Sequence, residues 1–168
     1  MINKIICIDD VYPETIQYFW PIKIIKKKYP QVHIIAFVVA NYADTQNIQK
    51  SNIFKDWFVE YKDMVEIGCH GYDHLYPPEQ ERDDAKELVK NSLEILTPYL
   101  KKNFLYRPPG HQRTIHTENM LQEFGFGGIA YQNRIKYFDG RIIDGGVLNL
   151  HCTRNKFENP IMKVYENL

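Results

Sequence analysis

The sequence lacks an excess of charge of either sign, and it lacks any long hydrophobic run. It carries 21 basic and 21 acidic residues, so its formal net charge is zero. Proteins that bind nucleic acid usually show a basic excess or a basic patch. No apolar run approaches the roughly 20 residues that a membrane-spanning helix needs. We therefore expect no nucleic-acid partner and no membrane span.

Cysteine is also scarce, and its spacing excludes further classes of site. Cys7, Cys69 and Cys152 show none of the Cys-x-x-Cys spacing of metal or redox motifs. Each lies in or beside an apolar segment, as buried thiols in a reducing compartment do. The apolar run over residues 5–8 is too short for a signal peptide, and two acids follow it at once. We expect a cytoplasmic protein.

Short apolar segments alternate with helical patterns along the chain. We expect strands over 4–8, 32–39, 64–69, 104–106, 126–131 and 147–150, with a hairpin over 137–144. We expect helices over 13–28, 53–61, 79–100 and 117–124. This alternation is typical of an α/β fold with a parallel sheet. At 168 residues the chain is predicted to form a single domain over 1–168.

The most informative stretch runs from Met64 to His74. Two histidines, His70 and His74, follow a predicted strand, and Gly71 allows the chain to turn sharply between them. Imidazole is a good ligand for zinc-like ions, and a catalytic site combines three protein ligands with an open position. Histidines this close together also occur by chance. The pair therefore needs a carboxylate from elsewhere in the chain.

Reactive residue types fall at the carboxyl ends of four predicted strands: Asp9-Asp10, His70 with His74, Arg107, and His151. In a parallel barrel or an open parallel sheet, these ends share the face where ligands bind. Each position also has an ordinary structural interpretation. The aspartates could cap a helix, Arg107 could form a structural ion pair, and His151 could be a buried histidine without a catalytic role.

In this order the motifs resemble those of the polysaccharide deacetylases, the chitooligosaccharide deacetylase homology domain of carbohydrate esterase family four. Residues 7–10 resemble the family's Thr-Phe-Asp-Asp, and residues 70–74 resemble its His-Ser/Thr-x-x-His. Residues 107–110 resemble its Arg-Pro-Pro loop, and residues 148–151 its Leu-x-Leu-His. The likeness covers about residues 5–152 and implies a distorted or incomplete (β/α) barrel of about seven strands. Gly71 stands where the family has Ser or Thr, and the family's fourth, Asp-containing motif is not visible.

The resemblance implies a role for each matching residue. Asp10, His70 and His74 would hold a divalent metal, with zinc expected first and cobalt or nickel as alternatives. Asp9 would be the general base for the metal-bound water that attacks an amide carbonyl, and this chemistry is sound without the family. Arg107 would hold Asp9 ionised through a charge-assisted pair. His151 would be the general acid that protonates the leaving amine.

Other residues are expected to contact the substrate. The backbone N–H of Gly110 is the candidate oxyanion donor, since the two prolines before it have none. Tyr72 and His111 are expected to touch the substrate. Tyr12 and Tyr42 fall on the same predicted face and could stack on a sugar, although scattered tyrosines more often serve packing.

Together these features predict a metal-dependent hydrolase that removes an N-acetyl group from an amino sugar or short saccharide. The expected partner is the N-acetylated sugar itself. Two alternatives stay open. One is a catalytically degenerate barrel that binds saccharide without turnover, and the other is a deformylase acting on another amino-sugar amide. Similarity of fold alone does not choose among them.

Overall fold

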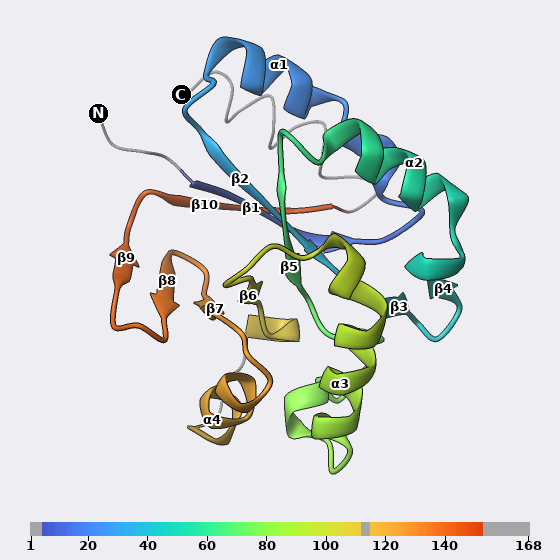
Figure 1. Ribbon diagram of the computed structural model, residues 1–168, viewed down its shortest axis with the longest axis vertical. Coiled ribbons are helices and arrows are strands. Elements are labelled where there is room, and N and C mark those ends of the chain that lie inside the picture. Colours follow the sequence, from blue (N-terminus) through green and yellow to red (C-terminus); the bar gives the residue numbers. More distant parts are fainter. Residues whose placement is uncertain (1–4, 112–114, 153–168) are drawn as a thin grey trace.

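The computed structural model describes residues 5–111 and 115–152, and its centre is one curved sheet (Figure 1). The sheet has eight strands in the order β10-β1-β2-β5-β6-β7-β8-β9. They are β1 (Ile5–Val11), β2 (His33–Val38), β5 (Glu66–Cys69), β6 (Leu105–Tyr106), β7 (Gly128–Ala130), β8 (Arg134–Tyr137), β9 (Ile142–Asp144) and β10 (Val147–His151). The strands from β10 to β7 pair in parallel, and β8 and β9 continue the sheet antiparallel.

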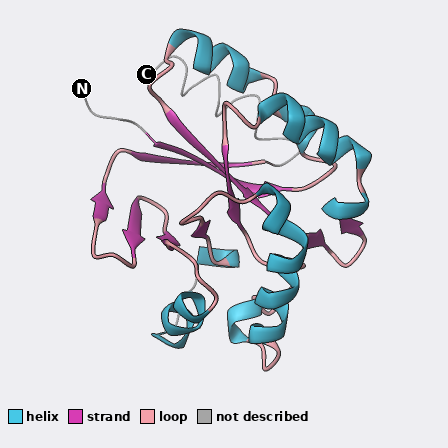
Figure 2. Ribbon diagram, in the orientation of Figure 1, coloured by secondary structure: helices cyan, strands magenta, loops and turns pink. Residues whose placement is uncertain are grey.

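The helices lie outside the curved sheet (Figures 1 and 2). They are α1 (Pro21–Lys28), α2 (Asn52–Tyr61), α3 (Ala85–Leu96) and α4 (Ile115–Glu123). Five short 3-10 turns accompany them in the described ranges: Ile16–Tyr18, Ile48–Lys50, Glu79–Glu81, Thr97–Tyr99 and Pro109–His111. Within the described residues β9 and β10 do not pair, so the barrel is incomplete. The expected fold class is confirmed, with eight strands instead of about seven.

Several predicted boundaries were wrong. The helix predicted over 13–28 begins only at Pro21, where a proline suits the first helical position, and a separate 3-10 turn precedes it. The helix predicted over 79–100 is helical only over Ala85–Leu96, with a 3-10 turn on each side. The predicted polar loop at 41–49 contains a small two-stranded sheet, β3 (Asn41–Tyr42) with β4 (Gln46–Asn47).

Two apolar clusters pack on opposite faces of the main sheet. Ile6 and Ile8 belong to the larger cluster, which includes the residues of α1, α2 and α3 that face the sheet. Ile5 and Cys7 belong to a smaller cluster with Phe37 inside the barrel. The side chains of β1 therefore alternate between the two faces, as on any extended strand. This alternation decides where the polar end of β1 points.

No helix in the described ranges is both long and apolar enough to cross a bilayer.

Candidate metal centre

A bulge in β1 changes the direction in which the side chains of Asp9 and Asp10 point. Pairing with β2 aligns Ile8 with Ala36 but Val11 with Val38, so β1 has one extra residue over this step. Asp10 has a φ of 57°, in the left-handed region that Asp tolerates better than most residues. A bulge of this kind re-aims a side chain. As a result, adjacent residues of one strand both face the same end of the barrel.

Asp10 lies between the two histidines that follow β5. Its Oδ1 is 3.4 Å from His70 Nε2 and 3.1 Å from His74 Nε2. One ligand atom from each of the three residues lies within 4.8 Å of the others. Ligand atoms about 2.1 Å from a tetrahedral zinc ion are roughly 3.4 Å apart, so this spacing fits such an ion. The donor set of two imidazoles and one carboxylate is also one that zinc accepts.

His70 is fixed by a hydrogen bond on the far side of its ring. The side chain is almost fully buried, and its Nδ1 lies 2.8 Å from the backbone oxygen of Arg107. A carbonyl oxygen only accepts, so the Nδ1–H of His70 must donate. The Nε2 lone pair therefore points toward Asp10 and is available to a metal.

His74 is more exposed than His70 and lies close to the charge of Asp10. Its side chain is 29% exposed, and its backbone is left-handed with a φ of 57°. Burial lowers the pKa of His74, but the hydrogen bond and charge of Asp10 together raise it above its ordinary value. A proton on His74 would have to leave before a metal could bind there.

Asp9 and Arg107 form a buried ion pair beside this cluster. Both side chains are fully buried, and Arg107 Nε lies 2.8 Å from Asp9 Oδ1. The guanidinium also donates to the backbone oxygen of Tyr131 at 3.1 Å and to the side-chain oxygen of Asn149. Its Cζ lies 4.9 Å from the ring centroid of Phe37, which belongs to the smaller apolar cluster. These contacts fix Arg107 and, through it, Asp9.

The second oxygen of Asp9 faces the loop after β6. His111 Nε2 lies 3.7 Å from Asp9 Oδ2, and within the described residues neither Asp9 oxygen accepts a hydrogen bond, although Oδ1 is in ion-pair contact with Arg107. Gly110 and His111 both have left-handed backbones, with φ of 67° and 57°, and Gly110 is exposed. The backbone of His151 pairs in register with Asp9, but its side chain lies outside the described part of the chain. The roles expected of Gly110, His111 and His151 therefore stay predictions.

A pair of stacked tyrosines lies beside His74. The rings of Tyr12 and Tyr42 stack with centroids 3.9 Å apart and planes at 4°, and the Tyr42 ring lies 6.2 Å from that of His74. Tyr72 packs partly against the larger apolar cluster, and its hydroxyl accepts a hydrogen bond from Asn41 Nδ2 at 3.2 Å. Contact between Tyr72 and a substrate stays a prediction.

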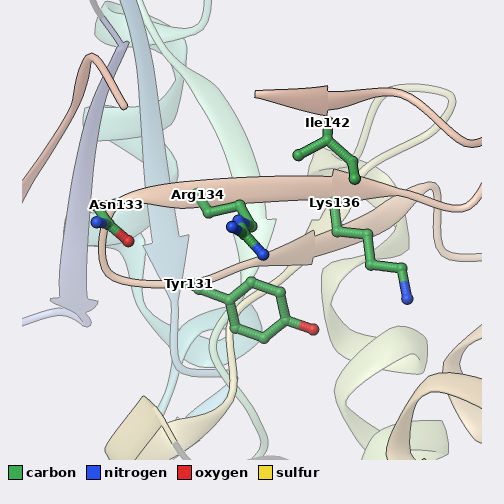
Figure 3. Close-up of a pocket in the computed structure, with 5 residues that line it drawn as sticks. All are labelled: Tyr131, Asn133, Arg134, Lys136 and Ile142. Carbon is green, nitrogen blue, oxygen red and sulfur yellow. The ribbon is translucent and has the colours of Figure 1, made fainter. Parts of the chain in front are cut away.

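A separate hollow lies on the outer face of β8. It has a volume of about 200 Å³ and is lined by Tyr131, Asn133, Arg134, Lys136 and Ile142 (Figure 3). Ile135, between the two basic residues, packs into the inner cluster, so its neighbours face outward. The charges of the two basic residues are already paired, with Asp144 and Glu118 respectively. None of the clustered aspartates and histidines lines this hollow.

One of three comparisons with known proteins finds a similar fold. No protein-family profile and no curated protein matches the chain. Among solved structures, the Xyl-CE4 domain of a multidomain xylanase from the hindgut metagenome of Trinervitermes trinervoides aligns with a TM-score of 0.57. The chain has the fold of a CE4 domain. The alignment covers 98% of this chain and 84% of that one at 14% identity, which shows the fold and no more.

Two residues near the cluster were not anticipated from the sequence. Asn149 orients Arg107, and a polar side chain inside an apolar strand was a signal that could have revealed it. Glu79 is fully buried behind the loop that carries the histidines, and burial raises the pKa of its carboxyl. Nothing in the local sequence marked Glu79, since it follows two prolines at the start of the helix predicted over 79–100.

Proposed function

We propose that this protein is a metal-dependent hydrolase that removes an N-acetyl group from an amino sugar or short saccharide. One observation carries the proposal: Asp10, His70 and His74 converge beside the buried Asp9–Arg107 pair. A metal site with a neighbouring carboxylate that is not itself a ligand suits hydrolysis by an activated water. The CE4-like fold supports this chemistry, although similarity of fold alone does not establish it.

Asp10, His70 and His74 would hold the ion, with zinc first and cobalt or nickel as alternatives. When bound, the ion would polarise the amide carbonyl and acidify a water molecule. Asp9 would take the proton from the attacking water through Oδ2, the oxygen that lies toward His111, while Oδ1 pairs with Arg107. Arg107 would keep Asp9 in place by holding Oδ1.

The remaining roles concern the two ends of the amide. The N–H of Gly110 would donate to the oxygen that becomes negative in the tetrahedral intermediate. His151 would give a proton to the departing amine. The Tyr12–Tyr42 stack beside His74 supports a sugar as the substrate, because partly exposed aromatic rings offer apolar surface to a pyranose. We take residues 1–168 as one catalytic domain.

The test combines metal analysis with product detection. Protein incubated with zinc and then desalted should retain about one ion per chain, and it should release acetate from N-acetylglucosamine oligomers. His70→Asn should lose both properties. His33→Asn is the matched control, because His33 also pairs with a carboxylate, Glu66 at 3.1 Å, but at the opposite end of the sheet.

Each alternative has its own signature in the same assay. Release of formate from N-formylated sugars, without acetate from N-acetylated ones, would indicate the deformylase. Saccharide binding with retained zinc and no product would indicate the degenerate barrel. If the protein bound none of zinc, cobalt and nickel under any loading condition, the metal-dependent hydrolase would be refuted.

A further inference from the structure

Glu79 is a buried carboxylate that the proposed reaction does not use. Its residue is 1% exposed, in the 3-10 turn Glu79–Glu81. Its Oε2 accepts the backbone N–H of Tyr72 at 2.6 Å, and its Oε1 accepts the hydroxyl of Tyr106. A carboxylate without such partners would be costly to bury. Each oxygen of Glu79 instead accepts one hydrogen bond.

Glu79 approaches the ligand loop at the one residue that has no side chain. Gly71 has a φ of 82°, and a Cβ placed there would lie 2.8 Å from Glu79 Oε2 and 2.9 Å from Pro109 Cγ. Real Cβ atoms essentially never come this close to other heavy atoms. The glycine between the two histidines is therefore required both by the turn and by the carboxylate packed against it.

The two hydrogen bonds of Glu79 connect the two segments that fix His70. Tyr72 follows His70 by two residues at the exit of β5. Tyr106 is the last residue of β6 and directly precedes Arg107, whose backbone oxygen accepts from His70 Nδ1. One carboxylate thus holds the histidine's own loop and the strand end that carries its hydrogen-bond partner.

We propose that Glu79 is a positioning residue, which ties the exits of β5 and β6 together and so holds His70 in its metal-binding orientation. The inference rests on the metal site proposed above. Glu79 touches neither the substrate nor the ion in this role. It supplies the support for the ligand loop that a side chain at position 71 cannot give.

Zinc affinity, measured by competition with a chromogenic chelator, tests the proposal. Glu79→Ala should weaken zinc binding by about 10- to 100-fold, as loss of groups that orient ligands does. Glu79→Gln should stay within about threefold, because its amide oxygen can accept from the Tyr72 N–H while its amide N–H donates to the Tyr106 oxygen. Glu118→Ala is the matched control, since Glu118 also accepts a tyrosine hydroxyl, from Tyr131 at 3.1 Å, but is not one of the three residues of the metal cluster.

A second variant and a spectroscopic measurement cover the case in which Glu79→Ala does not fold. Tyr106→Phe removes one of the two hydrogen bonds and should give a smaller loss of zinc affinity. In the metal-free protein, the Nδ1–H of His70 should give a slowly exchanging, downfield proton resonance. Exchange of this proton should be faster in Tyr106→Phe and unchanged in Glu118→Ala. A role in overall stability alone would not change it selectively.

The outcomes separate this inference from the proposed function. Native protein that binds none of zinc, cobalt and nickel overturns the metal site and this inference together. Native protein that binds zinc overturns this inference alone if Tyr106→Phe and every folded Glu79 variant bind equally tightly. Equal losses in Glu79→Gln and Glu79→Ala would also overturn it, because they would indicate that charge matters and positioning does not. The graded series with rescue by glutamine is the result we expect.

Discussion

Asparagine at position 9 and asparagine at position 10 should have opposite consequences, although the two aspartates are adjacent. Asp9→Asn should keep zinc and lose turnover, while Asp10→Asn should lose zinc. The reason is the bulge in β1, which points Asp9 toward Arg107 and Asp10 toward His70 and His74. The comparison is sharp because both substitutions remove one charge and conserve size.

The magnitudes follow from burial and partners. Removing one partner of a buried ion pair costs about 3–5 kcal/mol. Asparagine still offers an acceptor to Arg107, which also keeps Tyr131 and Asn149, so we expect Asp9→Asn to cost about 2–3 kcal/mol. Loss of a general base should lower kcat by roughly 10²- to 10⁴-fold. Asp10→Asn removes a ligand itself, so zinc affinity should fall by more than the roughly 100-fold seen for indirect partners.

Three measurements check this pair of variants: zinc content after desalting, the urea midpoint of the metal-free protein, and acetate release from N-acetylglucosamine oligomers. Asp139→Asn is the control, since Asp139 pairs with Arg141 at 2.8 Å on the surface, where an ion pair contributes little to stability. Zinc lost from Asp9→Asn and kept by Asp10→Asn would refute the reasoning, because the two aspartates would then have exchanged roles.

Three further predictions concern strain, thiols and pH. Gly71→Ala should lower the free energy of unfolding by about 2–4 kcal/mol, because position 71 has a left-handed backbone and a Cβ there would clash with its neighbours. Gly125→Ala should cost only about 1–2 kcal/mol, because position 125 has a left-handed backbone but open space around it. Urea denaturation measures both costs, and equal values would contradict the clash. Burial raises the pKa of Cys7 to about 12, so iodoacetamide at about pH 8 should modify it only after unfolding, as peptide mass spectrometry would show. In the metal-free protein, the stability that protonated His74 gains from Asp10 is fully present below pH 6.5 and is lost as pH rises through the raised pKa of His74. Urea titrations across that window should show the decline, and a His74→Asn variant with the same slope would count against it.

The sequence was informative where function depends on residue type and order. Apolar segments separated by helical patterns predicted the parallel sheet, and reactive residues at strand ends predicted one shared face. The parallel sheet is confirmed, and Asp10, His70 and His74 do lie together, because the carboxyl ends of parallel strands meet at one edge regardless of how the intervening helices begin or end. The helix boundaries near Pro21 and Ala85 were predicted less well, since tertiary packing overrides local propensity there.

Tertiary structure alone decided how the adjacent aspartates divide between two partners. An extended strand would have placed Asp9 and Asp10 on opposite faces. The bulge that prevents this is defined by register against β2, a contact between residues more than twenty positions apart. The role of Glu79 could not be predicted from the sequence for the same reason, because its hydrogen-bond partners come from β6 and from the loop after β5.

By itself, the chain's sequence determined the fold class and which residue types gather at one end of the barrel, because periodicity and strand order are properties of neighbours along the chain. Only the folded molecule decided which oxygen meets which nitrogen. Distances such as the 3.1 Å between Asp10 and His74 depend on bulges, left-handed residues and buried carboxylates whose partners are distant in sequence.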